Sequence, residues 1–318
     1  MTGAHKKYVS QFSMMGTVIT ITLFAPNQPI VEALYNYLAT MDRVFSMNRP
    51  DSELMAINRH AGQHPVAVSP ICFDLIQRAV TASQQQATSF NVLMGPVVKL
   101  WRIGFGGQTV PEQAAIDQAL ALTDPNAVVL DAAQHSVYLT HPGMMLDLGA
   151  IAKGYFADQM IGQLQAAGID QAIVNLGGNV KLLGCNPTTP TGQWTVGIQA
   201  PKAPRGYPAL QVVTTAKTVV TSGIFERYFR IGNRVYHHIL DPQTGYPVAR
   251  PIEQVSILTT NSEYAEILST VAFFKGVTAG VNYINQLPQV EAIFIDHQQQ
   301  IHTTAGLQHL SEGVYQYE

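Results

Sequence analysis

The chain has 318 residues, of which 47% are apolar and only 12% are charged, about half the usual share of charge in a globular protein. The formal net charge is −3 and the pI is near 6.4, so the surface is not expected to bind nucleic acid or anionic lipid by electrostatics. The mean hydropathy is +0.08, but no stretch approaches the ~18 uninterrupted apolar residues of a membrane-spanning helix, so we expect no membrane span.

The two cysteines, Cys72 and Cys185, lie far apart in the sequence. They form neither a metal-binding spacing nor a disulfide framework. Near the N-terminus, Lys6 and Lys7 are followed by no apolar run, and no lipid-attachment cysteine is present. We therefore expect the chain as given to be cytoplasmic.

The N-terminal half is predicted to contain both strands and helices. Alternating β-branched residues predict a strand at 16–24 after a first strand at 8–13, and apolar residues at helical spacing predict a helix at 30–45. Ser69 is expected to cap a helix at 71–86, and Pro111 to occupy the first position of a helix at 111–122. The other elements expected here are a short helix at 52–58, a hairpin of 128–130 with 137–139, a helix at 148–167 and a strand at 172–176.

The C-terminal half is richer in strands. Strands are predicted at 194–199, 210–213, 219–220, 228–231, 237–240, 255–259 and 292–295, and helices at 264–275 and 277–286. Because strands and helices do not alternate regularly, a doubly wound parallel sheet is not expected. The pattern favours an α+β fold in which helices pack on a mixed, largely antiparallel sheet. We find no repeat or linker, so residues 1–318 are predicted to form a single domain.

Three glycine-rich segments are candidates for close approach to a ligand. Asp147, Gly149 and Lys153 lie where a helix is predicted to start, and a helix N-terminus with a lysine suits a phosphate group. The spacing matches neither a P-loop nor a dinucleotide-binding fingerprint, so a tightly packed helix start with a surface lysine remains an alternative. The pairs Gly177–Gly178 and Ser222–Gly223 follow predicted strands, and each is also compatible with an ordinary turn.

Two further patterns carry side chains with useful chemistry. His237 and His238 are adjacent in a predicted strand, so they point to opposite faces, and one could line a site while the other packs. Glu266 and Thr270 are spaced i, i+4 on a predicted helix and therefore share a face. A carboxylate and a hydroxyl in this arrangement could form half of a Mg²⁺ site, although a glutamate on a helix usually faces solvent.

In their order along the chain, these segments resemble the ApbE family, the FAD:protein FMN transferases. The resemblance extends from Met15–Gly16–Thr17 to the 265–270 helix and beyond, which is nearly the whole chain. The segments that carry it are 90–101, 147–154, 175–179, 194–201, 221–223 and 238–245. Any one of these motifs would be weak, but six in the family's order are a specific signal.

The resemblance implies a single ApbE-like fold and a Mg²⁺-dependent reaction. An enzyme of this family cleaves FAD between its phosphates. It attaches FMN through a phosphoester to a threonine or serine of an acceptor flavoprotein and releases AMP. In phosphoryl transfer of this kind, positioning and charge neutralisation supply most of the rate.

The resemblance also assigns roles to residues of this chain. The metal ligands would be the Ala150 carbonyl, Glu266 and Thr270, and His238 would accept the proton of the attacking hydroxyl. The positions expected to bind FAD are Met15, Asn48, Asn91, Val92, Leu93, Asp147, Lys153, Gly177, Gly178, Ser222, Gly223 and Ile239.

Four of these positions depart from the family's usual residues. Glu266 replaces an aspartate, and the extra methylene moves the carboxylate by about one bond, whereas Mg²⁺ requires near-octahedral geometry. Asn91 and Leu93 stand where aspartate and threonine are usual, and Asn48 stands where an aromatic residue commonly covers the flavin. Two alternatives therefore remain: an FAD pyrophosphatase that gives FMN and AMP, or a flavin-binding protein that has lost catalysis.

Overall fold

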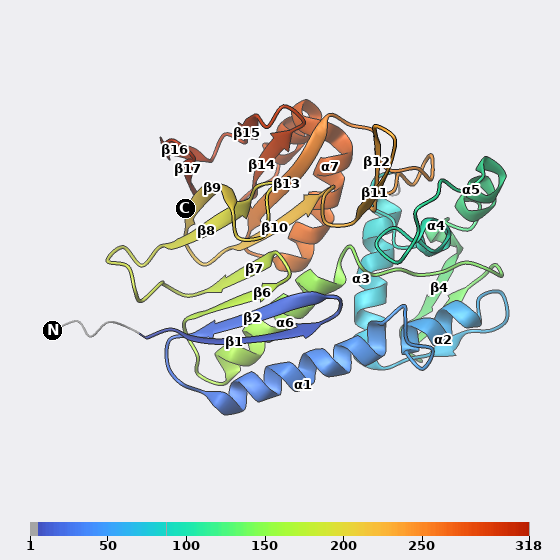
Figure 1. Ribbon diagram of the computed structural model, residues 1–318. Coiled ribbons are helices and arrows are strands. Elements are labelled where there is room, and N and C mark those ends of the chain that lie inside the picture. Colours follow the sequence, from blue (N-terminus) through green and yellow to red (C-terminus); the bar gives the residue numbers. More distant parts are fainter. Residues whose placement is uncertain (1–5, 87, 318) are drawn as a thin grey trace. The chain divides into compact units, whose positions relative to one another are not determined.

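The computed structural model describes residues 6–86 and 88–317, which form two compact units (Figure 1). The first unit comprises the residues up to Thr40, Lys153–Gly223 and the residues from Pro251 onward. The second comprises Met41–Ala152 and Ile224–Arg250. Each unit is therefore assembled from segments far apart in the sequence. That residues 1–318 act as a single domain stays a prediction.

An eight-stranded sheet forms the centre of the first unit (Figure 1). Every pair of neighbouring strands in it is antiparallel. In spatial order its strands are β1 (Tyr8–Met14), β2 (Thr17–Leu23), β6 (Ala172–Leu176), β7 (Asn179–Leu183), β10 (Thr218–Gly223), β13 (Ile252–Thr259), β14 (Glu291–Asp296) and β15 (Ile301–Thr303). The predicted α+β class, with a largely antiparallel sheet, is confirmed.

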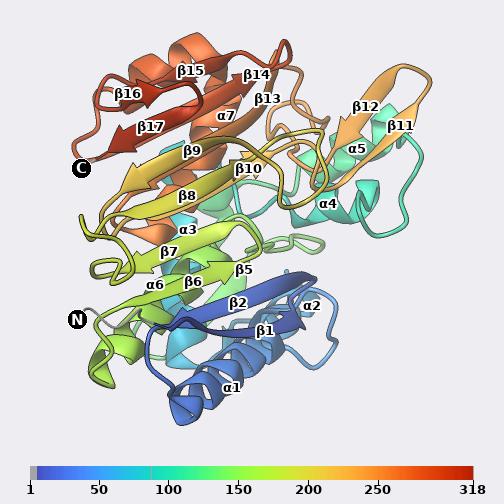
Figure 2. The ribbon, with the colours of Figure 1, turned by 60° about the vertical axis from the view of Figure 1, so that its left-hand side comes forward.

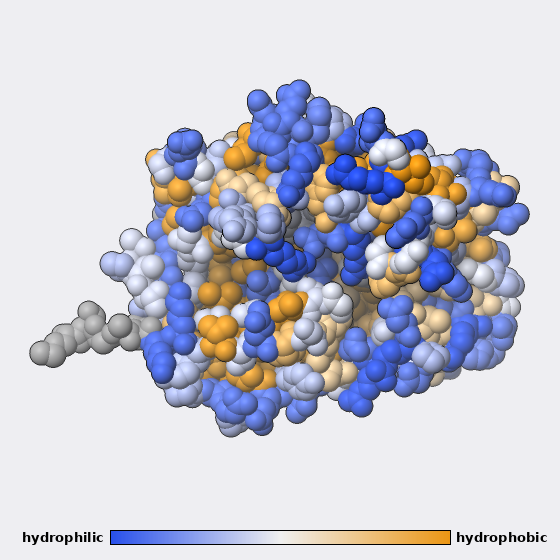
Figure 3. Space-filling model, viewed as in Figure 1, coloured by the Kyte–Doolittle hydropathy of each residue, from blue (hydrophilic) through white to orange (hydrophobic). Residues whose placement is uncertain are grey.

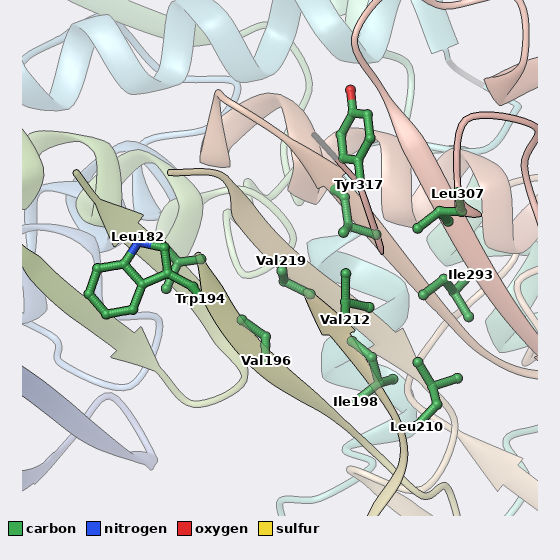
Figure 4. Packing of buried hydrophobic residues seen from close by; sticks show 11 residues of the cluster. Leu182, Trp194, Val196, Ile198, Leu210, Val212, Val219, Ile293, Leu307 and Tyr317 are labelled. Atoms are coloured by element: carbon green, nitrogen blue, oxygen red, sulfur yellow. The ribbon is translucent and has the colours of Figure 1, made fainter. Parts of the chain in front are cut away.

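A second sheet of the same unit packs over the first (Figure 2). Its strands, in spatial order, are β16 (Gln308–Ser311), β17 (Val314–Tyr317), β9 (Pro208–Thr214) and β8 (Trp194–Gln199), and only β17 and β9 run parallel. Trp194 and Val212 of this sheet belong to one buried hydrophobic cluster with Val219 and Ile293 of the large sheet (Figure 4). The sequence predicts no strand after 292–295, so β15–β17 were missed. All three are short, and every residue of β16 is exposed.

Helices complete the first unit: α6 (Ala152–Ala166), α7 (Ser262–Ile284) and most of α1 (Gln28–Phe45). α7 packs on β10, β13 and β14 (Figure 1). Gly276, with a φ of 72°, interrupts α7 at the point where the sequence predicts two successive helices. By length and composition alone α7 could cross a membrane, but half of its most apolar window is buried, and a core helix of a globular protein passes the same test.

The second unit contains short helices and two small antiparallel sheets. Its elements are α2 (Glu53–Arg59), β3 (Val66–Ala67), α3 (Pro70–Gln86), α4 (Gly95–Trp101), α5 (Gln113–Leu120), η1 (Pro125–Ala127), β4 (Val128–Asp131), β5 (Ser136–Leu139), β11 (Tyr228–Ile231) and β12 (Arg234–His237). Trp101 is buried against Phe229 and Tyr236 of the β11–β12 hairpin. Its indole N–H donates a 2.7 Å hydrogen bond to the carbonyl oxygen of Gly245. This core anchors the segment 224–250 to the rest of the unit.

Several predicted element boundaries in this unit were wrong. The Ser69 hydroxyl is buried and bonds to no described residue; instead the Ser69 N–H donates to the Glu53 carboxylate, so the side chain does not cap α3. Pro111 precedes the N-cap residue Glu112 and lies outside α5. The strand predicted at 237–240 lies three residues earlier, at Arg234–His237, because these residues pair with Tyr228–Ile231 in a hairpin.

The predicted helix at 148–167 begins later than expected. Its first helical residue is Ala152, because the residues before it form turns that start at Asp147. The Asp147 carboxylate bonds to the backbone of Gly149, an arrangement that competes with helix formation.

The surface of the first unit carries some apolar side chains around β1, β2 and α1 (Figure 3). Val9, Val18 and Tyr35 are 60%, 41% and 45% exposed. A shallow pocket beside Tyr35 is lined by Phe12 and Val31.

Candidate active site

Several predicted ligand-binding residues of the first unit lie at one end of the eight-stranded sheet. Met15–Gly16 connects β1 to β2, and Gly177–Gly178 connects β6 to β7. Because Ile19 pairs with Leu176, the two turns are neighbours, and a side chain on Gly177 would overlap Thr17. The strand β10 is antiparallel to β7 and continues beyond the Val219–Val180 pair, past the first residue of β7, so Ser222–Gly223 extend toward this end of the sheet.

Met15 adopts an unusual backbone conformation in its turn. Its φ is 53° and that of Gly16 is 71°, which is a two-residue hairpin turn with both central residues left-handed. Asparagine is preferred at the first of these positions. A residue with a long side chain destabilises the turn by about 1 kcal/mol or more there. A strained residue in a turn is grounds for a functional hypothesis, and Met15 remains a predicted flavin contact.

The crossing of α6 and α7 places the charged residues of this unit. Gly154 of α6 packs directly against the carbonyl oxygen of Ser262, at the start of α7. Asp158, one turn further along α6, accepts hydrogen bonds from the backbone N–H groups of Ser262 (2.8 Å) and Glu263 (3.0 Å). Lys181 of β7 lies 2.8 Å from the Asp158 carboxylate and is itself almost fully buried. The first turns of the two helices are therefore held together.

Glu266 is buried in this arrangement, at 6% exposure, rather than facing solvent. The Asn179 side-chain amide donates a 2.9 Å hydrogen bond to its Oε1, and the Lys153 ammonium lies 3.6 Å from the same oxygen. Thr270 lies one turn further along α7, where its hydroxyl donates to the Glu266 carbonyl at 3.2 Å and keeps its lone pairs.

These donors suit a hard cation. A carboxylate and a hydroxyl oxygen are ligands that Mg²⁺ accepts, and it usually completes its shell with water and phosphate oxygens. Within 6–86 and 88–317, no group of three or more His, Cys, Asp or Glu side chains could hold a metal ion. A metal at Glu266 would therefore also need hydroxyl, carbonyl or substrate oxygens. Ala150, whose carbonyl was predicted as such a ligand, is an exposed residue of the second unit.

Ser222 is linked to α7 by hydroxyl groups. Its Oγ lies 2.8 Å from Oγ of Ser269, and Ser269 donates to the Glu266 carbonyl at 3.0 Å. Because the Ser269 hydrogen is used in that bond, Ser222 is the donor to Ser269. The end of β10 and the Glu266–Thr270 turn of α7 are thus directly connected.

In the second unit, Asp147 is held by the backbone. Its N–H donates to the Val92 carbonyl at 2.8 Å, and its Oδ1 accepts the Gly149 N–H at 2.8 Å. Burial raises the pKa of Asp147, while the Gly149 hydrogen bond and the positive charge of Arg227 oppose the rise. A carboxylate in this setting is a good acceptor for N–H or O–H groups of a ligand.

Three predicted ligand positions around Asp147 have structural roles for their side chains. Val92 and Leu93 are 1% and 0% exposed and belong to the core. The Asn91 amide donates to the Thr123 carbonyl and accepts the Leu93 N–H, both at 2.8 Å. Asn48, by contrast, is exposed. Their contacts with a ligand stay predictions, and the observed hydrogen bonds show that the 91–93 segment positions Asp147.

The two adjacent histidines differ sharply in environment, as predicted, although only His237 lies in a strand. His237 is 5% exposed, its Nε2 bonds to the Val248 carbonyl at 3.1 Å, and its Nδ1 accepts the Ile239 N–H at 3.3 Å. Burial lowers the pKa of His237 to about 4, partly opposed by the Val248 bond. This histidine is therefore neutral near pH 7 and has a structural role that also orders Ile239.

His238 is half-buried and turned the other way. Its Nδ1 lies 3.2 Å from the Arg227 carbonyl oxygen, and its backbone N–H donates to the same oxygen at 3.1 Å. Because a carbonyl oxygen only accepts, Nδ1 carries the hydrogen and Nε2 carries the lone pair of the neutral ring. This tautomer presents a nitrogen that can take up a proton.

Sequence reasoning missed five residues that contact the predicted site residues or their neighbours within each unit: Asp158, Asn179, Lys181 and Ser262 in the first, and Arg227 in the second. Asn179 closes the 175–179 motif and could have been singled out on that ground. The other four contact partners that are distant in sequence, so no local sequence pattern identifies them.

The chain was also compared with known proteins. The ApbE family model matches residues 15–294. A curated FAD:protein FMN transferase of Klebsiella pneumoniae (strain 342) is 40% identical over 282 residues, covering 89% of this chain and 87% of that protein. One of Treponema pallidum (strain Nichols) is 35% identical over 318 residues, covering 95% and 88%.

Solved structures share the fold. The ApbE protein of Thermotoga maritima superposes with a TM-score of 0.83 at 27% identity, covering 94% of this chain and 97% of that one. The family match covers most of the sequence, and two relatives exceed 30% identity over nearly all of it. The chain therefore belongs to the ApbE family.

Proposed function

We propose that this protein is a Mg²⁺-dependent FAD:protein FMN transferase. It cleaves FAD between its phosphates, attaches FMN through a phosphoester to a threonine or serine of an acceptor flavoprotein, and releases AMP. The names of its relatives support this transferase activity. The observation that carries the proposal is the buried Glu266 carboxylate beside Lys153, with Thr270 one turn away on the same helix.

The first unit supplies charge for the two phosphates of FAD. Glu266 and Thr270 would hold Mg²⁺, which when bound neutralises phosphate charge. Lys153 is a third exposed and lies at the start of α6, where backbone N–H groups also favour an anion. Met15, Gly177, Gly178, Ser222 and Gly223 lie at the same end of the sheet and supply the surface for the rest of the ligand.

The second unit supplies the proton acceptor. The Nε2 lone pair of His238 takes the proton of the acceptor hydroxyl as its oxygen bonds to the phosphorus of the FMN half. The bond from that phosphorus to the bridging oxygen breaks, and AMP leaves with that oxygen. Asp147 accepts a hydrogen bond from FAD, and Ile239, beside the catalytic histidine, makes an apolar contact.

One observation favours a second activity. Asn48 is exposed and polar at a position where the family commonly has an aromatic side chain. Water would then reach the phosphorus more easily and could replace the protein hydroxyl, giving FMN and AMP. FAD pyrophosphatase activity is therefore the alternative.

The test is an incubation with FAD, Mg²⁺ and an acceptor protein whose modified threonine or serine is known, with its alanine variant as control. AMP is measured by chromatography, and covalent flavin by fluorescence of the acceptor in a denaturing gel. Equal amounts of AMP and labelled acceptor, both lost with EDTA, support the transferase. AMP without labelled acceptor identifies the pyrophosphatase, and the absence of both products identifies a flavin-binding protein.

A further inference from the structure

The two carboxylate oxygens of Glu266 have different surroundings. Oε1 accepts the 2.9 Å hydrogen bond of Asn179 and faces Lys153 at 3.6 Å. No hydrogen bond or ion pair joins Oε2 to any residue in the described part of the chain. The carboxylate therefore has one oxygen held by the protein and one available to a ligand.

The Asn179 side-chain amide is itself held by a chain of buried hydrogen bonds. Asn179 is 2% exposed, and Ser262 and Thr218 are both fully buried. The Ser262 hydroxyl donates to Oδ1 of Asn179 at 2.8 Å, and the Thr218 hydroxyl lies 3.1 Å from the Ser262 oxygen.

The direction of each bond in this chain follows from chemistry. A carboxylate only accepts, so the NH₂ end of Asn179 must face Glu266 and its carbonyl end must face Ser262. Ser262 must then donate to Asn179. A bond between Thr218 and Ser262 therefore uses the single hydrogen of Thr218, whose oxygen also lies 3.1 Å from the Val180 carbonyl oxygen. The amide has no second orientation that satisfies all partners.

We propose that Asn179 is a positioning residue for cation binding by Glu266. By holding Oε1, its amide selects one rotamer of the carboxylate and presents Oε2 as the metal ligand. This inference rests on the metal-dependent function proposed above and names a residue to which that function assigns no role.

The length of the glutamate explains why such a residue is needed here. Glutamate has one more rotatable bond than the aspartate usual in the family, so its carboxylate samples more positions. Mg²⁺ demands near-ideal geometry, and partners that orient its ligands typically contribute 10–100-fold to metal affinity. The Lys153 ammonium is farther from Oε1 than the Asn179 amide, and the lysine side chain is a third exposed. It therefore orients the carboxylate less, and a cation can take its place beside Glu266.

The experiment measures binding of Mn²⁺ alone, as a probe for Mg²⁺, by electron paramagnetic resonance, together with the melting temperature with and without Mg²⁺. Wild type is compared with Asn179→Leu and with Asn186→Leu. Asn186 is also buried in the first unit, and its side chain bonds within its own loop, to Thr188 and Gln193. Glu266→Gln defines the binding that depends on the carboxylate.

We expect Asn179→Leu to weaken Mn²⁺ binding by about 10–100-fold and to remove most of the Mg²⁺-induced rise in melting temperature. Asn186→Leu lowers the melting temperature but leaves both metal responses as in wild type, which separates positioning from stability. Wild-type affinity in Asn179→Leu overturns the inference while the proposed function stands. Mn²⁺ binding that is absent in wild type, or unaffected by Glu266→Gln, overturns both.

Ser262→Ala is the second variant, for the case in which Asn179→Leu does not fold. It leaves the amide in place but removes the group that orients it, and the backbone N–H of residue 262 still bonds to Asp158. We expect Mn²⁺ affinity to fall several-fold. An unchanged affinity in a folded Ser262→Ala protein contradicts the inference.

Discussion

The carbonyl oxygen of Ser262, at the start of α7, occupies the space in which any side chain on Gly154 of α6 would lie. This contact sets how closely the two helices approach. Lys153 precedes Gly154, and Glu266 follows Ser262 by one turn, so the same contact brings their charges to 3.6 Å. A glycine that looks like part of a phosphate-binding motif is therefore required for helix packing.

Gly154→Ala is expected to destabilise the protein by about 1–3 kcal/mol, because the new methyl group must displace backbone rather than a flexible side chain. Gly162→Ala on the same helix is the matched control. A methyl group there meets nothing within 4 Å, so it should stabilise the protein by about 0.5–1 kcal/mol through helix propensity. Urea unfolding of both variants checks the pair. Equal effects would show that Gly154 is not a packing constraint.

Glu266→Gln is expected to abolish Mg²⁺-dependent release of AMP from FAD. The amide keeps the size of the side chain and loses the charge that holds the ion. Removing one charge from a buried pair with Lys153 should leave the fold intact, because the lysine is partly exposed and can turn to water. AMP release across a Mg²⁺ titration, with circular dichroism as the folding control, is the measurement. Activity equal to that of wild type would exclude Glu266 as a ligand.

His238→Gln is expected to lower flavin transfer by about 10²–10⁴-fold while leaving the dissociation constant for FAD nearly unchanged. Glutamine can still donate to the Arg227 carbonyl but cannot take up the proton. Single-turnover labelling of the acceptor and fluorescence titration with FAD separate the two effects. A loss of FAD affinity with normal turnover of the bound fraction would instead indicate a binding role.

Met15→Asn should separate backbone strain from ligand contact. Asparagine tolerates the left-handed conformation of this turn, so the free energy of unfolding should rise by about 1 kcal/mol. Loss of the apolar side chain should weaken FAD binding by about tenfold, or ~1.4 kcal/mol. Thermal unfolding and FAD titration of the same variant test both parts. Higher stability without weaker binding would remove Met15 from the flavin site.

His237 should make the stability of the protein depend on pH. Burial lowers its pKa to about 4, below the ordinary value of 6.5, so the unfolded chain binds more protons than the folded one between these values. The contribution of His237 to stability is complete above pH 6.5 and declines as the pH falls, by about 3 kcal/mol once the pH is below 4.

The measurement is the free energy of unfolding of wild type and His237→Gln across this range. Glutamine can donate to the Val248 carbonyl but does not titrate, so the variant should show a shallower decline. Carboxylates that titrate in the same range change the free energy of unfolding of both proteins equally. Their effects therefore cancel when the two curves are subtracted. Parallel curves for the two proteins would show that His237 does not contribute.

Local patterns were sufficient for most elements and for the family's motifs. Alternating β-branched residues located β2, helical spacing located α1, and Gly276 marked the kink inside α7, because each signal depends only on neighbouring residues. The three glycine-rich segments were likewise visible, since a left-handed or closely packed backbone requires glycine at the position itself. Strands β15–β17 were not predicted, because each has three or four residues and β16 is exposed along its whole length.

The surroundings of the Glu266 carboxylate are set by tertiary structure alone. A glutamate on a helix usually faces water, and nothing near it in sequence indicates that Asn179 and Lys153, both about a hundred residues away, surround its carboxylate. The same holds for Asp158, which caps α7 from another helix. The sequence by itself therefore indicated which residues are candidates for the chemistry. The packing of distant segments determined which carboxylate oxygen is held and which can bind a ligand, because burial and hydrogen bonding are properties of the folded chain.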